Sequence, residues 1–105
     1  MSGERDDLTV DITTTTDGRP LVTIAGEVDV ETSPALATAI EGLVGGRTGV
    51  VVVDLSGVPF MDSSGFGALL GIHRAGAAIL VRNPSRQVRQ LLDVVGVPGV
   101  VEIES

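Results

Sequence analysis

Residues 50–70 read VVVVDLSGVPFMDSSGFGALL, in which a valine run, a polar region and an apolar helical pattern follow one another. The valines at positions 50–53 are typical of a strand that is buried on both faces of a sheet. We expect residues 54–61 to form a loop and Ser63 or Ser64 to cap a helix. The apolar or partly apolar residues at helical spacing are Phe66, Leu69, Leu70 and His73. This succession predicts a strand followed by a helix, which is the unit of an α/β fold.

Two strands and a helix are expected upstream of this stretch. Leu8, Val10 and Ile12 alternate with polar residues, a pattern that predicts a half-buried strand. Asp17-Gly18 indicates a hairpin turn, after which residues 21–25 form the returning strand. Residues 34–44 then form a helix that begins after the capping residues Thr32 and Ser33. The apolar face of that helix and the glycines that end it are Leu36, Ile40, Leu43, Val44, Gly45 and Gly46.

Downstream, residues 77–81 predict another central strand, and Asn83-Pro84-Ser85 starts a third helix that Gly96 ends. Residues 100–103 predict a short last strand. The expected fold is therefore α/β, in the order ββαβαβαβ, with a mostly parallel or mixed sheet of about five strands and three helices. We expect residues 8–105 to form this one domain and residues 1–7 to be a flexible N-terminus.

Composition limits the chemistry that the chain can perform. The 105 residues, 43% of them hydrophobic, suit one domain with a core of its own. Because the chain has no cysteine and His73 is its only histidine, we expect no disulfide, no metal site and no cofactor. A net charge of −7 argues against binding to nucleic acid. No apolar run approaches the ~20 residues of a membrane span, and residues 1–7 do not resemble a targeting signal, so we expect a cytoplasmic protein without membrane contact.

Residues 60–67, which read FMDSSGFG, lie where a functional group is expected, between the carboxyl end of a buried strand and the start of a helix. Unpaired backbone amides at a helix start tolerate an anion, so a serine hydroxyl there could accept a phosphoryl group. The simpler alternative is that Asp62 or Ser63 is only a helix cap, while Gly65 and Gly67 permit close packing. Physical chemistry alone leaves both interpretations open.

Three motifs resemble those of bacterial anti-sigma factor antagonists, the small STAS-domain proteins. Residues 62–67, DSSGFG, resemble the family signature, and residues 24–29, IAGEVD, resemble its Gly-Glu-hydrophobic-Asp turn. Residues 83–85, NPS, with the apolar residues that follow them, resemble the last helix of the family. The motifs have the family's order and spacing over most of residues 8–103. Because parallel strands end at the same edge, we expect the segments that carry the first two motifs to lie side by side.

The resemblance implies partner switching rather than catalysis. A family member with a bare serine binds an anti-sigma factor that is also a serine kinase, and this frees a sigma factor. Phosphorylation of the serine by that kinase releases the antagonist, and a serine phosphatase resets it. The acceptor maps to Ser63, with Ser64 in a capping or supporting role. The resemblance implies these partner-binding residues: Glu27, Asp29, Asp62, Ser63, Ser64 and Gly65.

Two alternatives remain at this stage. The chain could be a STAS module of another assembly, such as a stress-signalling scaffold or a lipid-transport complex, with Ser63 unmodified. A serine hydrolase would need a base near Ser63, and the sequence offers only His73, ten residues later. The chain also departs from the family pattern, because only residues 66–76 separate the signature from the next strand and no helix follows the fifth strand. We therefore expect a shortened second helix beside the partner surface.

Overall fold

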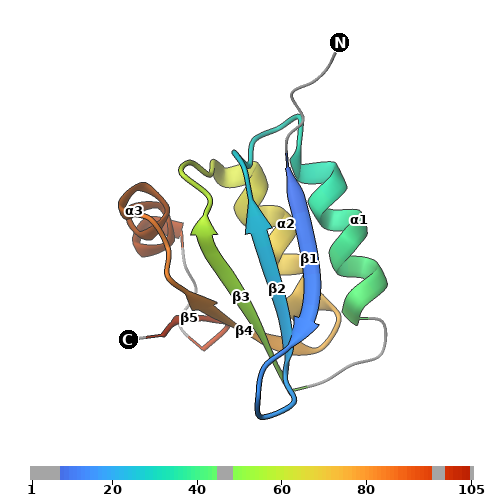
Figure 1. The fold of residues 1–105 in the computed structure, drawn as a ribbon. Coiled ribbons are helices and arrows are strands. Elements are labelled where there is room, and N and C mark those ends of the chain that lie inside the picture. The colour runs from blue at the N-terminus through green and yellow to red at the C-terminus, as the bar shows by residue number, and fades with distance from the viewer. Residues whose placement is uncertain (1–7, 45–48, 96–98, 105) are drawn as a thin grey trace.

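Five strands form one sheet in the computed structural model, and they lie in the sheet in the order in which they follow along the chain (Figure 1). The structure describes residues 8–44, 49–95 and 99–104. Strands and helices alternate in the predicted order ββαβαβαβ. Their bounds are β1 Thr9–Thr14, β2 Pro20–Ala25, α1 Ser33–Val44, β3 Gly49–Gly57, α2 Ser63–Arg74, β4 Ala77–Arg82, α3 Arg86–Val95 and β5 Val101–Ile103.

The sheet is mixed, because β1 pairs antiparallel with β2 while the other three pairs of neighbouring strands are parallel. A tight turn joins β1 to β2, and in it the Thr15 amide donates a 2.8 Å hydrogen bond to the Arg19 carbonyl. Gly18 has a φ of 90°, which glycine adopts without steric cost. The predicted hairpin and the predicted parallel pairing of the later strands are both confirmed.

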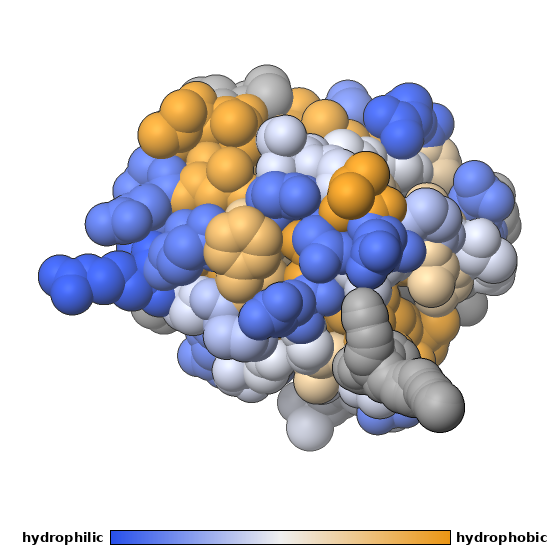
Figure 2. Space-filling view, turned by 90° about the horizontal axis from the view of Figure 1, so that it is seen from above, coloured by the Kyte–Doolittle hydropathy of each residue, from blue (hydrophilic) through white to orange (hydrophobic). Residues whose placement is uncertain are grey.

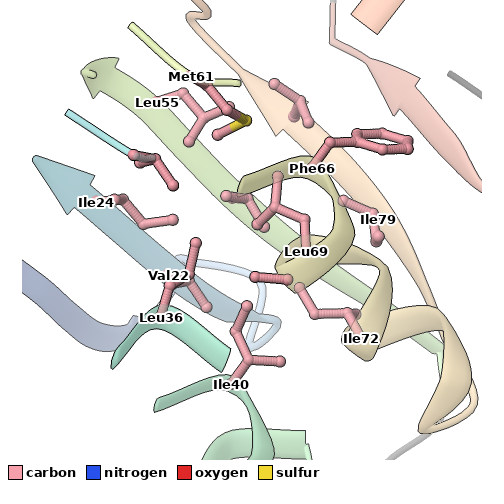
Figure 3. Close-up of a cluster of buried hydrophobic side chains, with 14 of the residues drawn as sticks. Val22, Ile24, Leu36, Ile40, Leu55, Met61, Phe66, Leu69, Ile72 and Ile79 are labelled. Carbon is pink, nitrogen blue, oxygen red and sulfur yellow. The ribbon is translucent and has the colours of Figure 1, made fainter. Parts of the chain in front are cut away.

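The helices cover one face of the sheet. Each parallel connection leads from one strand to the next in the same direction across the sheet. Because such connections are right-handed, they place their helices on the same face of the sheet. In Figure 1, α2 lies behind the strands, and α1 lies next to α2 on the side of β1. Alternate residues of the strands point to this side and pack against α1 and α2 (Figure 3). Buried residues that form this core include Val22, Ile24, Leu36, Ile40, Val53, Leu55, Leu69 and Ile72, and α3 adds Val88 and Leu92.

β3 is longer than predicted. It continues to Gly57, so the expectation of a loop over residues 54–61 is wrong for its first half. Asp54 pairs with Thr23 on one side and Arg82 on the other, and Gly57 pairs with Ala25. β2 supplies backbone partners as far as Gly57, with a register shift between Thr23 and Ala25, whereas the pairing with β4 ends at Asp54. This tertiary pairing, mainly with β2, outweighs the turn-like composition of the sequence.

One expectation about burial is wrong, and several others concern residues outside the described ranges. Ile12, expected on the buried side of a half-buried strand, is 45% exposed on the edge strand β1. The predicted flexible segment 1–7 and the predicted helix ends at Gly45-Gly46 and Gly96 lie outside the described residues, as do the side chains of Leu43 and Val44. Within the described ranges, no helix has the length and apolar character that crossing a membrane requires.

Candidate functional site

The turn after β2 and the loop after β3 are joined by a short β-bridge at the carboxyl edge of the sheet. Val28 pairs with Met61 in the parallel sense. The Val28 amide donates to the Phe60 carbonyl at 3.0 Å, and the Asp62 amide donates to the Val28 carbonyl at 3.1 Å. Both bridge side chains are buried in the core. The structure thus brings the two motif-bearing segments together, as the parallel strands predict.

Asp62 is the residue that caps α2. Its backbone is extended, with φ −104° and ψ −175°, and its Oδ1 accepts hydrogen bonds from the amides of Ser64 at 2.9 Å and Gly65 at 3.2 Å. The Ser64 hydroxyl donates to the same oxygen at 2.5 Å. This hydrogen bond, followed by those from the two amides, holds the pKa of the Asp62 carboxyl below its ordinary value of 3.8. Of the three capping residues that the sequence left open, Asp62 is the one that caps the helix, so the expectation for Ser63 or Ser64 is wrong, and Ser64 supports the cap.

Ser63 is the first residue of α2 and is exposed. Among the described residues, none forms a hydrogen bond with its hydroxyl group, in contrast to Ser64. A helix start carries a partial positive charge that favours an added negative group. The site therefore presents one available hydroxyl on a fixed backbone, next to a carboxylate that already holds the helix cap.

Gly65 fixes how closely α2 approaches the bridge. A Cβ atom at this position would lie 2.5 Å from Cγ1 of Val28 and 2.8 Å from Cγ of Met61, which is closer than van der Waals contact allows. A Cβ atom on Gly67, two residues later in the same helix, would meet nothing within 4 Å. The glycine at position 65 is therefore required by packing, whereas packing does not require the one at position 67.

Asp29 organises the turn that leads into α1. Its Oδ1 accepts from the amides of Glu31 at 3.0 Å and Thr32 at 3.1 Å. The Thr32 hydroxyl, which has one proton to donate, lies 3.0 Å from the Glu27 carbonyl oxygen and 3.2 Å from Oδ1 of Asp29. Asp29 is half-buried, while the Glu27 side chain is exposed. Of the two predicted partner-binding carboxylates in this turn, Glu27 is the one that faces solvent, and Asp29 also has a structural role.

Three residues on or beside the two bridged segments were not predicted from the sequence as site residues. Val30 is 71% exposed and Phe60 is 40% exposed, so the two bridged segments both present apolar surface. Seen from above in Figure 2, this end of the molecule shows apolar side chains interspersed with hydrophilic ones. Gln87 of α3 forms hydrogen bonds with the backbone of Met61. Periodicity could not identify Val30 or Phe60 because exposure in loops has no period, and Gln87 acts across 26 residues of sequence.

Within the described ranges, neither a histidine nor a metal-binding cluster lies beside Ser63. His73 is exposed near the other end of α2, about 15 Å from Ser63 along the helix axis at 1.5 Å per residue. It cannot activate the serine, and the hydrolase alternative loses its only candidate base. In the part of the chain that the structure describes, no three His, Asp or Glu side chains gather in a way that could hold a metal ion.

The chain is similar to several proteins that are named anti-sigma factor antagonists. The anti-sigma-B factor antagonist of Bacillus subtilis is 29% identical over 90 residues, which are 80% of this chain and 80% of that protein. An anti-sigma factor antagonist from Mycobacterium paratuberculosis has a TM-score of 0.76 and 26% identity, covering 95% of this chain and 87% of the other. Unphosphorylated SpoIIAA, also an anti-sigma factor antagonist, has a TM-score of 0.71 and 23% identity, covering 92% and 89% of the two chains.

The family assignment is independent of any single relative. The sequence model described as "Mlab, STAS domain" matches residues 4–102, nearly the whole chain. The five-stranded mixed sheet with three helices is the fold that the chain shares with SpoIIAA. This protein belongs to the STAS domain family.

Proposed function

We propose that this protein is an anti-sigma factor antagonist, which binds an anti-sigma factor in its unmodified form and is released when Ser63 is phosphorylated. The relatives that are named anti-sigma factor antagonists support the role, and SpoIIAA is known in a phosphorylated form as well. The observation that carries the proposal is the state of Ser63, whose hydroxyl is exposed at a helix start while that of Ser64 is engaged by Asp62.

The modification is a phosphoryl transfer in which this chain is the substrate. The γ-phosphoryl group of ATP passes to Oγ of Ser63, the hydroxyl proton passes to a base of the kinase, and ADP leaves. The anti-sigma factor itself is the kinase in this proposal, and a serine phosphatase hydrolyses the phosphoserine to restore the hydroxyl. This chain is bound and modified, and catalyses neither step, so it needs no cofactor of its own.

We expect the added phosphate to change the charge of the docking surface without unfolding the protein. The phosphate adds a charge of about −1.5 to −2 at pH 7, next to Asp62. The α2 start offsets part of this repulsion within the protein. A partner packed closely over Ser63 must instead desolvate the dianion or clash with it. A loss of only ~3 kcal/mol weakens binding more than a hundredfold, so release does not require refolding.

The proposed docking surface combines carboxylates with apolar side chains. Glu27 is exposed in the turn before α1, and Asp62 caps α2 beside it, in a chain whose net charge is −7. Val30 and Phe60 supply apolar area on the same two bridged segments. A partner that fits this surface carries arginine or lysine around an apolar contact. The proposed location of this exchange is the cytoplasm, without nucleic acid or membrane.

Binding of two variants to purified anti-sigma factors tests the proposal. Each ATP-dependent anti-sigma factor of the source organism is titrated calorimetrically with Ser63→Ala and with Ser63→Asp. We expect one of them to bind Ser63→Ala as tightly as wild type and Ser63→Asp more than a hundredfold more weakly. Gln90→Glu, which adds one negative charge to an exposed position of α3, is the matched control and should bind normally.

Equal affinity of the two Ser63 variants would show that charge at this position does not control binding. The protein would then act as a STAS interaction module with an unmodified serine. Circular dichroism of Ser63→Asp must show the wild-type fold, because the proposal places the effect in the interface and not in folding.

A further inference from the structure

The carboxamide of Gln87 forms hydrogen bonds with both backbone polar groups of Met61. The Met61 amide donates to Oε1 of Gln87 at 2.9 Å, and Nε2 of Gln87 donates to the Met61 carbonyl at 3.0 Å. Gln87 is half-buried in the first turn of α3, which lies near the β3–α2 loop in Figure 1. We refer to this pair of hydrogen bonds as the Gln87 clamp.

The clamp completes the pairing that the β-bridge begins. Val28 takes the Phe60 carbonyl and the Asp62 amide, the groups on either side of Met61. The polar groups of Met61 itself point the other way, where a further strand would pair with them and where Gln87 pairs instead. With its side chain fully buried as well, Met61 is fixed by the bridge, the core and the clamp.

Met61 directly precedes the capping residue Asp62, which is followed by the acceptor Ser63. A shift of the Met61 backbone therefore also shifts Ser63. We infer that Gln87 is a positioning residue for Ser63, which sets where the phosphoryl acceptor stands relative to the docking surface. The inference rests on the proposed function for its consequence, but the contact itself does not. A misplacement of about 1 Å in a group that must meet a reacting atom can cost a hundredfold in rate, so the clamp acts on turnover.

The chemistry of the clamp requires an amide. Gln87 offers one donor and one acceptor at the same end of its side chain, and Met61 uses both. A leucine of similar size offers neither and leaves two part-buried backbone groups without their partner. A glutamate keeps the acceptor, but when ionised it presents a second acceptor to the Met61 carbonyl.

Phosphorylation kinetics provide the first test. The probe is ATP with the purified anti-sigma factor that binds Ser63→Ala in the experiment above. We expect Gln87→Leu to lower kcat for Ser63 phosphorylation about tenfold or more, with KM within about twofold, because Glu27, Val30 and Phe60 still form the docking surface. Gln90→Leu makes the same replacement at an exposed position of the same helix and should leave both constants unchanged. A wild-type kcat for Gln87→Leu would overturn the inference.

A pH titration of Gln87→Glu provides a test that needs no partner. Protonation of the introduced carboxyl restores one donor and one acceptor, so the Ser63 and Ser64 amide resonances should return toward wild-type positions as pH falls. Repulsion from the Met61 carbonyl should raise the pKa of that carboxyl above the ordinary ~4.3. The charged residues next to the clamp in the chain are Asp62 and Arg86. Asp62 titrates below 3.8, and parallel titrations of wild type and Gln87→Leu account for it.

The two tests separate the inference from the proposed function. If no anti-sigma factor phosphorylates or binds the wild-type protein, the proposed function fails, and the titration alone decides the role of Gln87. Ser63 and Ser64 resonances of Gln87→Glu that equal those of wild type at every pH would overturn the positioning role. The same holds if those resonances stay displaced at low pH, since the restored amide-like group should then restore the position of Ser63.

Discussion

The Ser64 hydroxyl donates a 2.5 Å hydrogen bond to Oδ1 of Asp62, and the same oxygen accepts the Ser64 amide at 2.9 Å. Ser64 thereby uses its polar groups to hold the helix cap. Ser63, which lies between the two residues in the chain, is exposed at the first position of α2. The adjacent serines therefore differ in chemistry, although their side chains are the same.

The first prediction concerns which serine accepts phosphate. With ATP and the anti-sigma factor kinase, Ser64→Ala should still gain one phosphate, and Ser63→Ala should gain none. The free energy of unfolding of Ser64→Ala should also be about 1 kcal/mol lower than that of wild type, because Asp62 loses one hydrogen bond. Intact mass and phosphopeptide sequencing measure the first effect, and urea unfolding measures the second. Phosphate on Ser64 with Ser63 bare would reverse the assignment.

The second prediction concerns acid. The Ser64 hydroxyl, and after it the Gly65 and Ser64 amides, lower the pKa of Asp62 below 3.8 in the folded protein. A lowered pKa means that ionised Asp62 stabilises the fold above pH 3.8, and that this contribution is lost as pH falls through the lower folded-state value. The free energy of unfolding should therefore fall more steeply below pH 4 for wild type than for Asp62→Asn.

Urea unfolding at pH 6, 4 and 3 checks this difference in slope. Asp17, whose pKa is lowered chiefly by a hydrogen bond from Thr15 and then by Arg19, is present in both proteins and cancels in the comparison. Identical pH dependence of the two proteins would mean that the Asp62 charge contributes nothing to the cap.

The third prediction compares two glycines of α2. Gly65→Ala should lower the free energy of unfolding by about 1–3 kcal/mol, because its Cβ overlaps Val28 and Met61. Gly67→Ala should raise it by about 0.5–1 kcal/mol, because its Cβ has open space and alanine favours a helix. Chemical denaturation of both variants measures the difference. Equal effects would show that α2 is free to shift away from the bridge.

The fourth prediction compares two exposed valines. Val30→Ala should weaken binding to the anti-sigma factor about fivefold, since it removes roughly 1 kcal/mol of apolar contact from the docking surface. Val94→Ala is the control, because Val94 is 83% exposed on α3, and this variant should bind the anti-sigma factor as tightly as wild type does. Both variants should keep wild-type stability, because neither valine is buried. A larger effect at Val94 would place the interface on α3.

The elements that could be predicted are those whose residues carry a local signal. The valines at 50–53, the Asp17-Gly18 turn and the Ser85 start of α3 each have a pattern that depends on near neighbours, and each lies where expected. Ser85 accepts a hydrogen bond from the Val88 amide at 3.3 Å, as a capping residue does. The second half of β3 carries no such pattern, because its conformation depends on pairing with β2, which continues to Gly57 after the pairing with β4 has ended at Asp54.

The site divides in the same way. The motifs indicated Asp62, Ser63 and Gly65, and of the two glycines at which close packing was expected, Gly65 shows it and Gly67 does not. Which residue caps α2 required the geometry, because aspartate and serine are equally good at that position. Gln87 could not be predicted, since a glutamine in a helix has no preferred partner in the sequence and Met61 lies 26 residues earlier.

The bridge between Val28 and Met61 has a consequence for the timing of the proposed switch. Because the protein alone already joins its two docking segments, a partner meets a finished surface and association needs no folding step. Association then proceeds at rates set by diffusion and orientation, about 10⁵–10⁷ M⁻¹s⁻¹ for typical protein pairs. After phosphorylation, this protein leaves the anti-sigma factor at a rate that is set by the lifetime of their complex. A phosphate on Ser63 that shortens this lifetime therefore also shortens the time before the anti-sigma factor can bind a sigma factor again.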